Sequence, residues 1–528
     1  MIITINAAQF LVMTLINEWL LFLTAIIFGV YIWSKYHYCY WRRKNIANIE
    51  PNIIFGNIKE IVNFSKTATD HLTALYNHEK AEGESVLGIY ILNKPALLVR
   101  DLSLVKSILV KDFNKFSNRY SASDSHGDPL GANSLFFIKN PQWKEMRTKL
   151  TPVFTSGKIK QMFPLVEEIG RELDSFLRDL PMESGSNVQE IKEINALYTT
   201  DVIASVAYGV HANSLQNPNG DFRRNGRHVF NFTLWRAFEF TAMFFAPQLV
   251  SLFRCKVFSK ESTKFIRETI SLIMSERMRT GAVRNDLIDI LIAFKKEAEG
   301  CEAKKHYVMN DDMLIAQAGI FFTAGFETSS ATMSFGLYEL SKRPELQNRL
   351  REEIKHILTK NDGKVTYEAV NKMEYLNMVI QEVLRLYPPL PFLDRVCTLA
   401  KDEKEYSLEP YSDFNIPHGM PVLIPIYGIQ RDPKYFLNPD EFDPERFSPD
   451  NKRNIVPFSY IPFGTGPHNC IGERFALIQT KIGFINFLRN HYVRPCDKSQ
   501  PTMVLDPRAL IIQSKGGIYC KIVRDPLI

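Results

Sequence analysis

A single cysteine is delivered to the start of an apolar segment by the glycine-rich stretch Phe463-Gly464-Thr465-Gly466-Pro467-His468-Asn469-Cys470-Ile471-Gly472. Glycine has no Cβ, so this backbone can fold tightly and bring its N–H groups close to the sulfur. The apolar pattern from Glu473 to Leu488 predicts a helix, whose partial positive charge at the N-terminus favours a thiolate at Cys470. A thiolate held in this way is a metal ligand or a nucleophile.

Cys470 taken alone also has simpler interpretations. A lone cysteine beside a turn is most often a buried structural residue. A zinc site requires further Cys or His at short spacing, and His468 is too close to belong to a usual tetrahedral set. A cysteine hydrolase requires a separate His and Asn, which one sequence cannot place. The choice among these depends on the rest of the chain.

Composition and charge restrict the class of protein. The 528 residues are 45% hydrophobic and 23% charged, which is typical of a globular protein with a large core. The formal net charge of +6 is too weak to indicate nucleic acid as a partner, and no block of Lys and Arg suggests one. Seven cysteines are scattered without a C-x-x-C pair, which favours a reducing compartment. Without an internal repeat or a long linker, we expect one domain.

The N-terminus predicts a membrane anchor. Residues 1–34 contain one charged side chain, Glu18, and the run from Trp19 to Trp33 is apolar. Extended back past Glu18, this run reaches the roughly 20 residues that a transmembrane helix needs. A cleaved signal is the alternative, but the basic n-region and the small-residue cleavage site are missing. Basic residues follow the span and place the next domain in the cytosol, namely Lys35, Arg42, Arg43 and Lys44. We therefore expect an anchor (1–34), a basic linker (35–50) and one catalytic domain (51–528).

Four short patterns precede the cysteine loop. In chain order they are Trp143-x-x-x-Arg147, Ala324-Gly325-Phe326-Glu327-Thr328-Ser329, Glu382-x-x-Arg385 and Pro444-Glu445-Arg446-Phe447. The first and third place two side chains on one helix face. The second lies in a long helical pattern, Asp311 to Ser341, where a glycine costs stability and so needs a reason. Each pattern alone is a weak signal, and their fixed order makes them informative.

The cysteine loop resembles the haem-thiolate loop F-x-x-G-x-R-x-C-x-G of the cytochrome P-450 monooxygenases. Phe463, Gly466, Cys470 and Gly472 match it, and the four preceding patterns match that family in the same order. His468 stands where the family usually has Arg. A neutral imidazole donates one hydrogen bond but lacks the permanent charge and the fork of a guanidinium. This departure concerns the anchoring of a haem propionate rather than the sulfur ligand.

The resemblance covers the chain from about residue 35 to the C-terminus and implies a mostly α fold with a small β portion (α+β). Haem b would lie between the helix 311–341 and the loop that carries Cys470, its axial ligand. The residues implied around the haem and its propionates are Arg119, Trp143, Arg147, Arg395, His468, Phe463 and Gly466.

The resemblance also assigns roles away from the propionates. Ala324 and Gly325 would leave room for dioxygen above the cofactor. Glu327 and Thr328, an acid beside an alcohol, would organise water that delivers protons. The alternative for this pair is a surface Glu and a Thr bonded back to a helix carbonyl. A buried structural charge network is implied behind the haem, made of Glu382, Arg385 and Arg446.

Several further segments predict secondary structure or a pocket. Residues 86–99 predict a β-hairpin that turns at Asn93-Lys94-Pro95, and 422–425 and 510–512 predict short strands, the last lining the pocket by resemblance. The aromatic run 230–253 is either core, the lining of an apolar channel, or a surface that dips into the bilayer.

By resemblance the chain is an animal microsomal monooxygenase, similar to insect detoxification enzymes. It would insert one oxygen atom of O2 into a small hydrophobic organic compound, either a xenobiotic or an endogenous lipid-like compound. Electrons would come from NADPH through NADPH-cytochrome reductase, with cytochrome b5 as a further partner. The location would be the endoplasmic reticulum membrane, with the catalytic domain on its cytosolic side. One rival is a haem-thiolate isomerase of peroxides, which the Glu327-Thr328 pair argues against. Another is a non-catalytic haem-binding or hydrophobe-binding membrane protein, which His468 keeps open.

Overall fold

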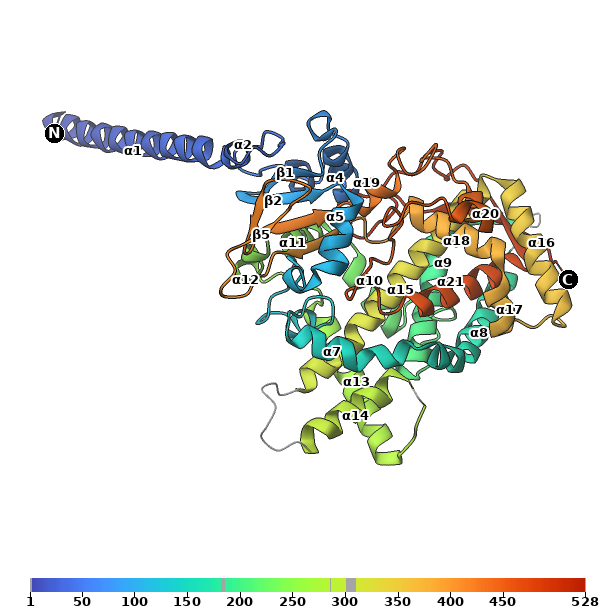
Figure 1. The fold of residues 1–528 in the computed structure, drawn as a ribbon. Helices are drawn as coiled ribbons and strands as arrows, with labels where there is room; N and C mark the ends of the chain where they lie inside the picture. The colour runs from blue at the N-terminus through green and yellow to red at the C-terminus, as the bar shows by residue number, and fades with distance from the viewer. Residues whose placement is uncertain (1, 182–185, 285, 301–309, 528) are drawn as a thin grey trace.

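The computed structural model describes residues 2–181, 186–284, 286–300 and 310–527. Helices dominate, and three small sheets lie toward the edges of the domain (Figure 1). This confirms the predicted class, mostly α with a small β portion.

The helices alternate between long core elements and short turns. In the first part of the chain they are α1 (Ile2–His37), α2 (Tyr40–Arg43), α3 (Lys59–Val62), α4 (Ala68–Tyr76), α5 (Leu102–Lys106), α6 (Pro129–Ala132), α7 (Gln142–Leu150) and α8 (Ser156–Asp179). In the middle they are α9 (Ile191–Ile203), α10 (Asp221–Phe230), α11 (Leu234–Phe245), α12 (Val250–Phe253), α13 (Lys260–Thr280), α14 (Leu287–Gly300) and α15 (Asp311–Ser341). In the last part they are α16 (Pro344–Lys360), α17 (Tyr367–Lys372), α18 (Glu374–Leu386), α19 (Ile426–Gln430), α20 (Pro449–Lys452) and α21 (Glu473–Leu488).

The strands form sheets of four, three and two strands, ordered β1-β2-β7-β4, β3-β9-β8 and β5-β6. Their bounds are β1 (Val86–Ile91), β2 (Lys94–Val99), β3 (Ser186–Glu190), β4 (Leu393–Val396), β5 (Glu405–Ser407), β6 (Asn415–Pro417), β7 (Pro421–Ile424), β8 (His491–Arg494) and β9 (Tyr519–Arg524). Only β2 and β7 pair in parallel among these described strands.

The predicted hairpin is present, with a different turn. The strands are joined at Leu92 and Asn93, and Pro95 lies inside β2 opposite Tyr90. The predicted strand at 422–425 is present as β7, one residue earlier. The strand predicted at 510–512 is wrong, because Ile512 donates its N–H to the carbonyl of Pro389 instead of to a strand neighbour, at 3.1 Å.

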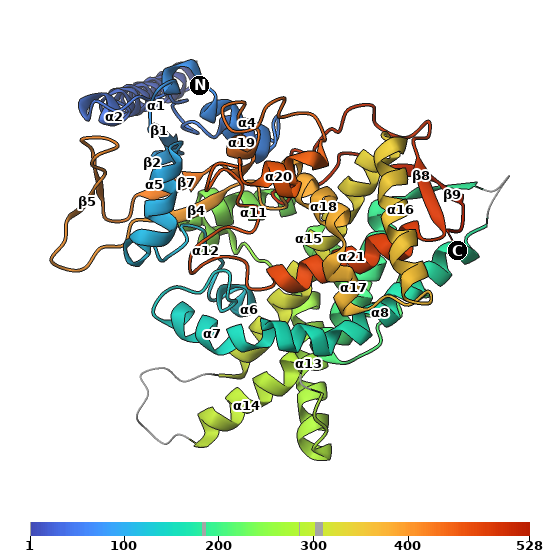
Figure 2. The same cartoon turned by 45° about the vertical axis from the view of Figure 1, so that its right-hand side comes forward.

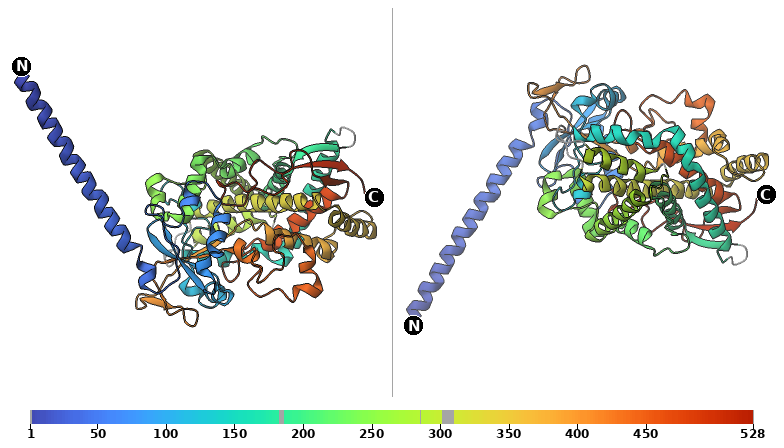
Figure 3. Two further views of the ribbon diagram at one scale, coloured as in Figure 1. Left: turned by 90° about the horizontal axis from the view of Figure 1, so that it is seen from above. Right: turned by 90° about the horizontal axis from the view of Figure 1, so that it is seen from below.

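The N-terminal helix α1 stands away from the rest of the molecule (Figure 3). Its large apolar side chains are exposed, for example Trp19 at 71% and Phe28 at 62%. Within the described residues, the segment Val12–Arg43 is long and apolar enough to cross a membrane. The helix is tied to the domain by Trp41, which is fully buried and donates its indole N–H to the carbonyl of Ile89, at 2.9 Å.

Two helices with the bounds that the sequence predicted form the centre of the domain (Figure 2). The long helix α15 begins where the side chain of Asn310 accepts a hydrogen bond from the N–H of Met313, an N-cap. Most of its side chains are buried, and it packs along α9 and against α21. A helix that is apolar on nearly every side belongs in a core.

The aromatic run 230–253 divides among environments. Phe232 and Phe245 are buried in the core, whereas Phe230, Phe240 and Phe244 line a cavity. Other large side chains of this stretch are exposed, namely Leu234, Trp235, Leu252 and Phe253. Both the core and the channel-lining alternatives therefore apply to different members of the run.

The six cysteines in the described part of the chain are free, and Cys301 lies outside the described residues. This agrees with the scattered cysteine pattern.

The charge network forms as the sequence predicts. Arg385 makes two bonds of 2.7 Å to the carboxylate of Glu382, and both side chains are fully buried. Arg446, on η7 (Pro444–Phe447), approaches the same carboxylate at 3.4 Å. Arg385 also donates to the carbonyls of Gln430 and Pro439, which fixes the segment leading to the cysteine loop.

We expect Arg385→Leu to destabilise the fold strongly, because the buried carboxylate of Glu382 then keeps only the N–H of Asp443, at 2.9 Å, and the more distant cation of Arg446. The cost should be about 3–5 kcal/mol. The control is Arg349→Leu, which removes an exposed ion pair with Glu445 and should cost about 1 kcal/mol or less. Urea unfolding of the detergent-solubilised protein, followed by tryptophan fluorescence, measures both. Equal losses in the two variants would contradict the buried-network assignment.

Candidate active site

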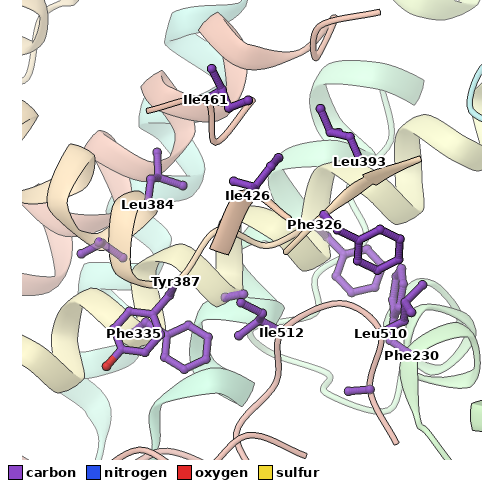
Figure 4. Packing of buried hydrophobic residues seen from close by; sticks show 14 of the residues in the cluster. Phe230, Phe326, Phe335, Leu384, Tyr387, Leu393, Ile426, Ile461, Leu510 and Ile512 are labelled. Carbon is purple, nitrogen blue, oxygen red and sulfur yellow. The ribbon is translucent and has the colours of Figure 1, made fainter. Parts of the chain in front are cut away.

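A cavity separates α15 from the cysteine loop. Its residues come from both walls and from the surrounding elements: Arg119, Leu135, Phe136, Phe137, Trp143, Arg147, Val153, Phe154, Ile203, Val206, Phe230, Phe240, Phe244, Ile320, Phe321, Ala324, Gly325, Thr328, Leu390, Leu393, Phe463, Gly464, His468, Asn469, Cys470, Ile471, Gly472, Leu510 and Ile511. Figure 4 shows Phe230, Leu393 and Leu510 gathered near Phe326 of α15. The wall is largely apolar, with phenylalanine its most frequent side chain.

The loop turns tightly enough to present Cys470 to this cavity. Its N–H donates to the carbonyl of Phe463 at 2.8 Å, which closes the loop. Gly466 has φ +73°, and a Cβ there would lie 2.0 Å from the carbonyl oxygen of Leu109. Only glycine fits this position. Cys470 is exposed to the cavity, and the N–H of Gly472 bonds to its sulfur.

The thiol itself is not acidified by this setting. Burial raises the pKa of Cys470, and this effect outweighs the N–H of Gly472 and the charge of Arg147, which lower it. Burial therefore opposes the thiolate that the start of α21 favours. A bound metal ion is what deprotonates a thiol in such a place.

Cations gather at one edge of the cavity around a single carboxylate. Asp394 is fully buried and accepts from the N–H of Ser121 at 2.7 Å and from Arg119 at 3.3 Å. Burial alone would raise its pKa, but Arg119, Arg395 and Lys139 outweigh burial and lower it. Burial lowers the pKa of Arg395 to about 9 and that of Lys139 to about 8. Three basic side chains thus act on the single carboxylate of Asp394.

These residues fit the haem that the sequence resemblance implies. The Nε atoms of Arg119 and Arg395 are buried without a hydrogen-bond partner in the described structure. Buried donors of this kind call for an anionic acceptor, and a haem carries two propionates. The remaining cavity is largely apolar, and Cys470 is the one cysteine in its described lining, which suits a planar apolar group with a metal centre. Arg119 and Arg395 would hold the propionates, and Cys470 would hold the metal.

His468 does not point its donor at this anion site. Its Nε2 lies 2.8 Å from the carbonyl of Ser117, and its ring stacks on Trp143 with 3.6 Å between centroids. Burial, followed by the charges of Arg395 and Arg119, lowers the pKa of His468 far below its ordinary value, so the ring is neutral. The one N–H of the neutral ring is thus used within the protein.

Arg147 is also engaged next to the cysteine. Its two terminal nitrogens donate to the carbonyl and to the side-chain oxygen of Asn469, at 2.8 and 2.7 Å. It lines the cavity, as does Trp143 on the same face of α7. The sequence resemblance predicts that both residues reach a haem propionate; the structure places them beside the loop, and the bond to Asn469 gives no sequence signal.

On the opposite wall, Ala324, Gly325 and Thr328 line the cavity. A Cβ at Gly325 would lie 2.4 Å from Cδ1 of Ile203 in α9, so close helix packing is a second reason for glycine there. The hydroxyl of Thr328 donates to the carbonyl of Ala324 at 2.8 Å. Glu327 is buried, with 3% exposure, and lies outside the described lining of the cavity.

Sequence reasoning missed several polar residues at this site. Asp394 and Lys139 shape the cation cluster, and Gln479 of α21 donates to the carbonyl of Gly325 at 3.1 Å. Asp394 directly precedes Arg395, and an acid beside a predicted anion-binding Arg is a signal that could have found it. Nothing in the sequence marks the other two.

The comparisons agree with this site. A family model described as Cytochrome P450 matches residues 48–521. "Probable cytochrome P450 6g2" of Drosophila melanogaster is 51% identical over 516 residues, which cover 96% of this chain and 99% of that protein. "Probable cytochrome P450 6v1" of the same organism is 42% identical over 511 residues, covering 95% and 98%. "Cytochrome P450 6k1" of Blattella germanica is 39% identical over 520 residues, covering 96% and 97%.

These matches extend over nearly the whole chain, and they include the cysteine loop, α15 and the charge network. The family binds haem b and catalyses monooxygenation, which confirms the cofactor and the reaction class that the sequence predicts. The chain therefore belongs to the cytochrome P450 family of haem-thiolate monooxygenases.

Proposed function

We propose that this chain oxidises small, uncharged, aromatic or otherwise apolar compounds, xenobiotics among them, in the cavity between α15 and the cysteine loop. The observation that carries the proposal is the composition of that cavity. Cys470 lies on one wall and Ala324, Gly325 and Thr328 lie on the other, while the sides are mainly phenylalanine. Aromatic faces and edges favour aromatic ligands, and an apolar wall rejects a charged one.

Cys470 is the proposed axial ligand, held in place by the closed loop and by the N–H of Gly472. When bound, haem supplies the binding of dioxygen and the oxygen-transfer chemistry. Phe463 and Gly466 shape the loop. On the opposite wall, the small residues Ala324 and Gly325 leave space above the cofactor. The protein thus contributes orientation and a dry pocket.

Proton delivery is the proposed role of Glu327 and Thr328. The hydroxyl hydrogen of Thr328 is donated to the carbonyl of Ala324, so its oxygen is left to accept a hydrogen bond from water in the cavity. Glu327 lies one residue away on the buried side of the helix. Protons then pass from the carboxyl side through ordered water to the cavity at Thr328.

The exterior of the molecule supports a proposal for its location and its electron supply. We place α1 in the endoplasmic reticulum membrane and the domain in the cytosol, since basic residues follow the apolar helix.

NADPH-cytochrome reductase is the proposed electron donor, with cytochrome b5 as a further partner, and both would dock on the Cys470 side. Lys144 and Arg474 are exposed there, whereas Lys149 and Lys160 pair with acidic neighbours.

We expect His468→Arg to leave the haem content per polypeptide close to that of the natural protein. The reason is that Arg119 and Arg395 supply the charged donors, while His468 spends its donor on Ser117. Arg395→Leu is the contrast, because loss of one charge-assisted bond costs about 1.5–3 kcal/mol, roughly a tenfold or greater loss of haem affinity. Haem content is measured by absorbance against total protein. A large rise in haem content in His468→Arg would contradict this account of the propionate site.

Turnover tests the function as a whole. The full chain, reconstituted in vesicles with NADPH-cytochrome reductase, should dealkylate an alkoxycoumarin only when NADPH is present. With an aromatic hydrocarbon as substrate under ¹⁸O2, the hydroxylated product should carry one ¹⁸O atom. Conversion of an organic hydroperoxide without NADPH or dioxygen, and no product with them, would identify an isomerase instead. A haem-loaded protein inactive in both assays would overturn the proposal in favour of a binding protein.

A further inference from the structure

Glu327 is held on the buried side of α15 by two partners from distant parts of the chain. Its Oε1 lies 2.9 Å from Nζ of Lys192, at the start of α9, and 2.9 Å from Nε2 of Gln513, in the C-terminal loop. Lys192 also donates to the hydroxyl of Ser330, one turn further along α15, at 2.8 Å. One carboxylate oxygen therefore joins three segments.

The ion pair with Lys192 compensates the burial of the Glu327 carboxylate. A buried carboxylate without a partner destabilises the fold strongly, and a hydrogen-bonded cation offsets that cost. Lys192 is not deeply buried, since 21% of its side chain is exposed, whereas only 4% of the Glu327 side chain is. The pair thus lies between the interior of α15 and solvent.

Gln513 connects the same carboxylate to the walls of the cavity. The second donor of its amide points to the carbonyl of Phe230, at 3.4 Å. Phe230 lines the cavity, and so do Leu510 and Ile511, which precede Gln513 in the same loop. Figure 4 labels Phe230 and Leu510, and also Ile512 on the loop that carries Leu510. A compound that contacts these side chains therefore contacts the loop that holds Glu327.

We propose that Lys192 and Gln513 are positioning residues for Glu327, and that Gln513 links the placement of this acid to the loop that contacts the substrate. The inference rests on the proposed function, in which Glu327 supplies protons to the cavity. Lys192 keeps the carboxylate paired inside the protein, and Gln513 fixes Oε1 relative to Phe230. Without either partner, proton delivery by Glu327 is slowed. Dioxygen that has taken two electrons from NADPH through the reductase then leaves with two protons as hydrogen peroxide.

The test uses the haem-loaded full chain in vesicles with reductase, and compares Lys192→Met, Gln513→Leu and Glu327→Gln. The matched control is Gln500→Leu. Gln500 orders the same loop through bonds to Ser514 and Lys515, but no contact with Glu327 is present in the described structure. For each variant, product and hydrogen peroxide are measured per NADPH consumed, together with the solvent deuterium isotope effect.

For Lys192→Met and Gln513→Leu we expect the ratio of product to peroxide to fall roughly tenfold, less than the 10²–10⁴ that complete loss of general-acid catalysis costs. The solvent isotope effect should rise, while haem content and the substrate dissociation constant from spectral titration stay near wild type. Gln500→Leu should match wild type in all four quantities. A second readout is thermal unfolding, in which adding Glu327→Gln to Lys192→Met should recover part of the lost midpoint.

The variants separate the positioning roles of Lys192 and Gln513 from the role of Glu327 as proton donor. If Glu327→Gln raises peroxide but neither Lys192→Met nor Gln513→Leu does, the positioning roles are wrong and the proposed function stands. If Glu327→Gln leaves the ratio unchanged, its role as proton donor fails and this inference fails with it. Equal losses in Gln513→Leu and Gln500→Leu would show loop order alone. If Lys192→Met does not fold, Lys192→Arg, which keeps the cation, should retain coupling, and Gln513→Leu tests the proposal independently.

Discussion

An excess of buried positive charge beside an apolar cavity is the constraint on which the site depends. Arg119, Arg395 and Lys139 share the single carboxylate of Asp394, and two guanidinium Nε atoms remain without a partner. Such a cluster is costly unless an anion completes it. Haem, with two propionates on an otherwise apolar ring, satisfies both requirements, so the cation cluster beside the cavity supports the cofactor that the cysteine loop indicates.

The two walls of the cavity are connected in ways that keep them in register. The fully buried side chain of Gln479, on α21, donates to the carbonyl of Gly325 on α15, and Tyr198 of α9 donates to the carbonyl of Gln479 at 3.0 Å. The loop before Cys470 is fixed separately through Gln430. The side-chain oxygen of Gln430 accepts a hydrogen bond from the N–H of Ile461, and its amide nitrogen donates to the carbonyl of Arg385. Both the sulfur and the opposite wall are therefore positioned by rigid elements.

Local patterns predicted the helices and the motifs, and long-range contacts set the rest. The bounds of α15 and α21 follow from continuous apolar sequence with an N-cap at Asn310, so the sequence alone defines them. Three contacts of the site join residues that are far apart in the chain: Glu327 with Lys192, Glu327 with Gln513, and Arg147 with Asn469. A single sequence carries no record of such pairs. His468 shows the same limit. The sequence reveals that His stands where the family usually has Arg, but it does not reveal that the ring stacks on Trp143. The predicted strand at 510–512 failed because the N–H of Ile512 had a partner in another segment.

The central claim is that Cys470 ligates haem as a thiolate. It is tested most directly by the absorption difference spectrum of the reduced, carbon-monoxide-bound protein, compared with a Cys470→Ala variant. The account predicts a strongly red-shifted Soret band in the natural protein and none in the variant. Absence of that band in natural protein that is folded and loaded with haem would contradict it, because Cys470 would then not be the ligand.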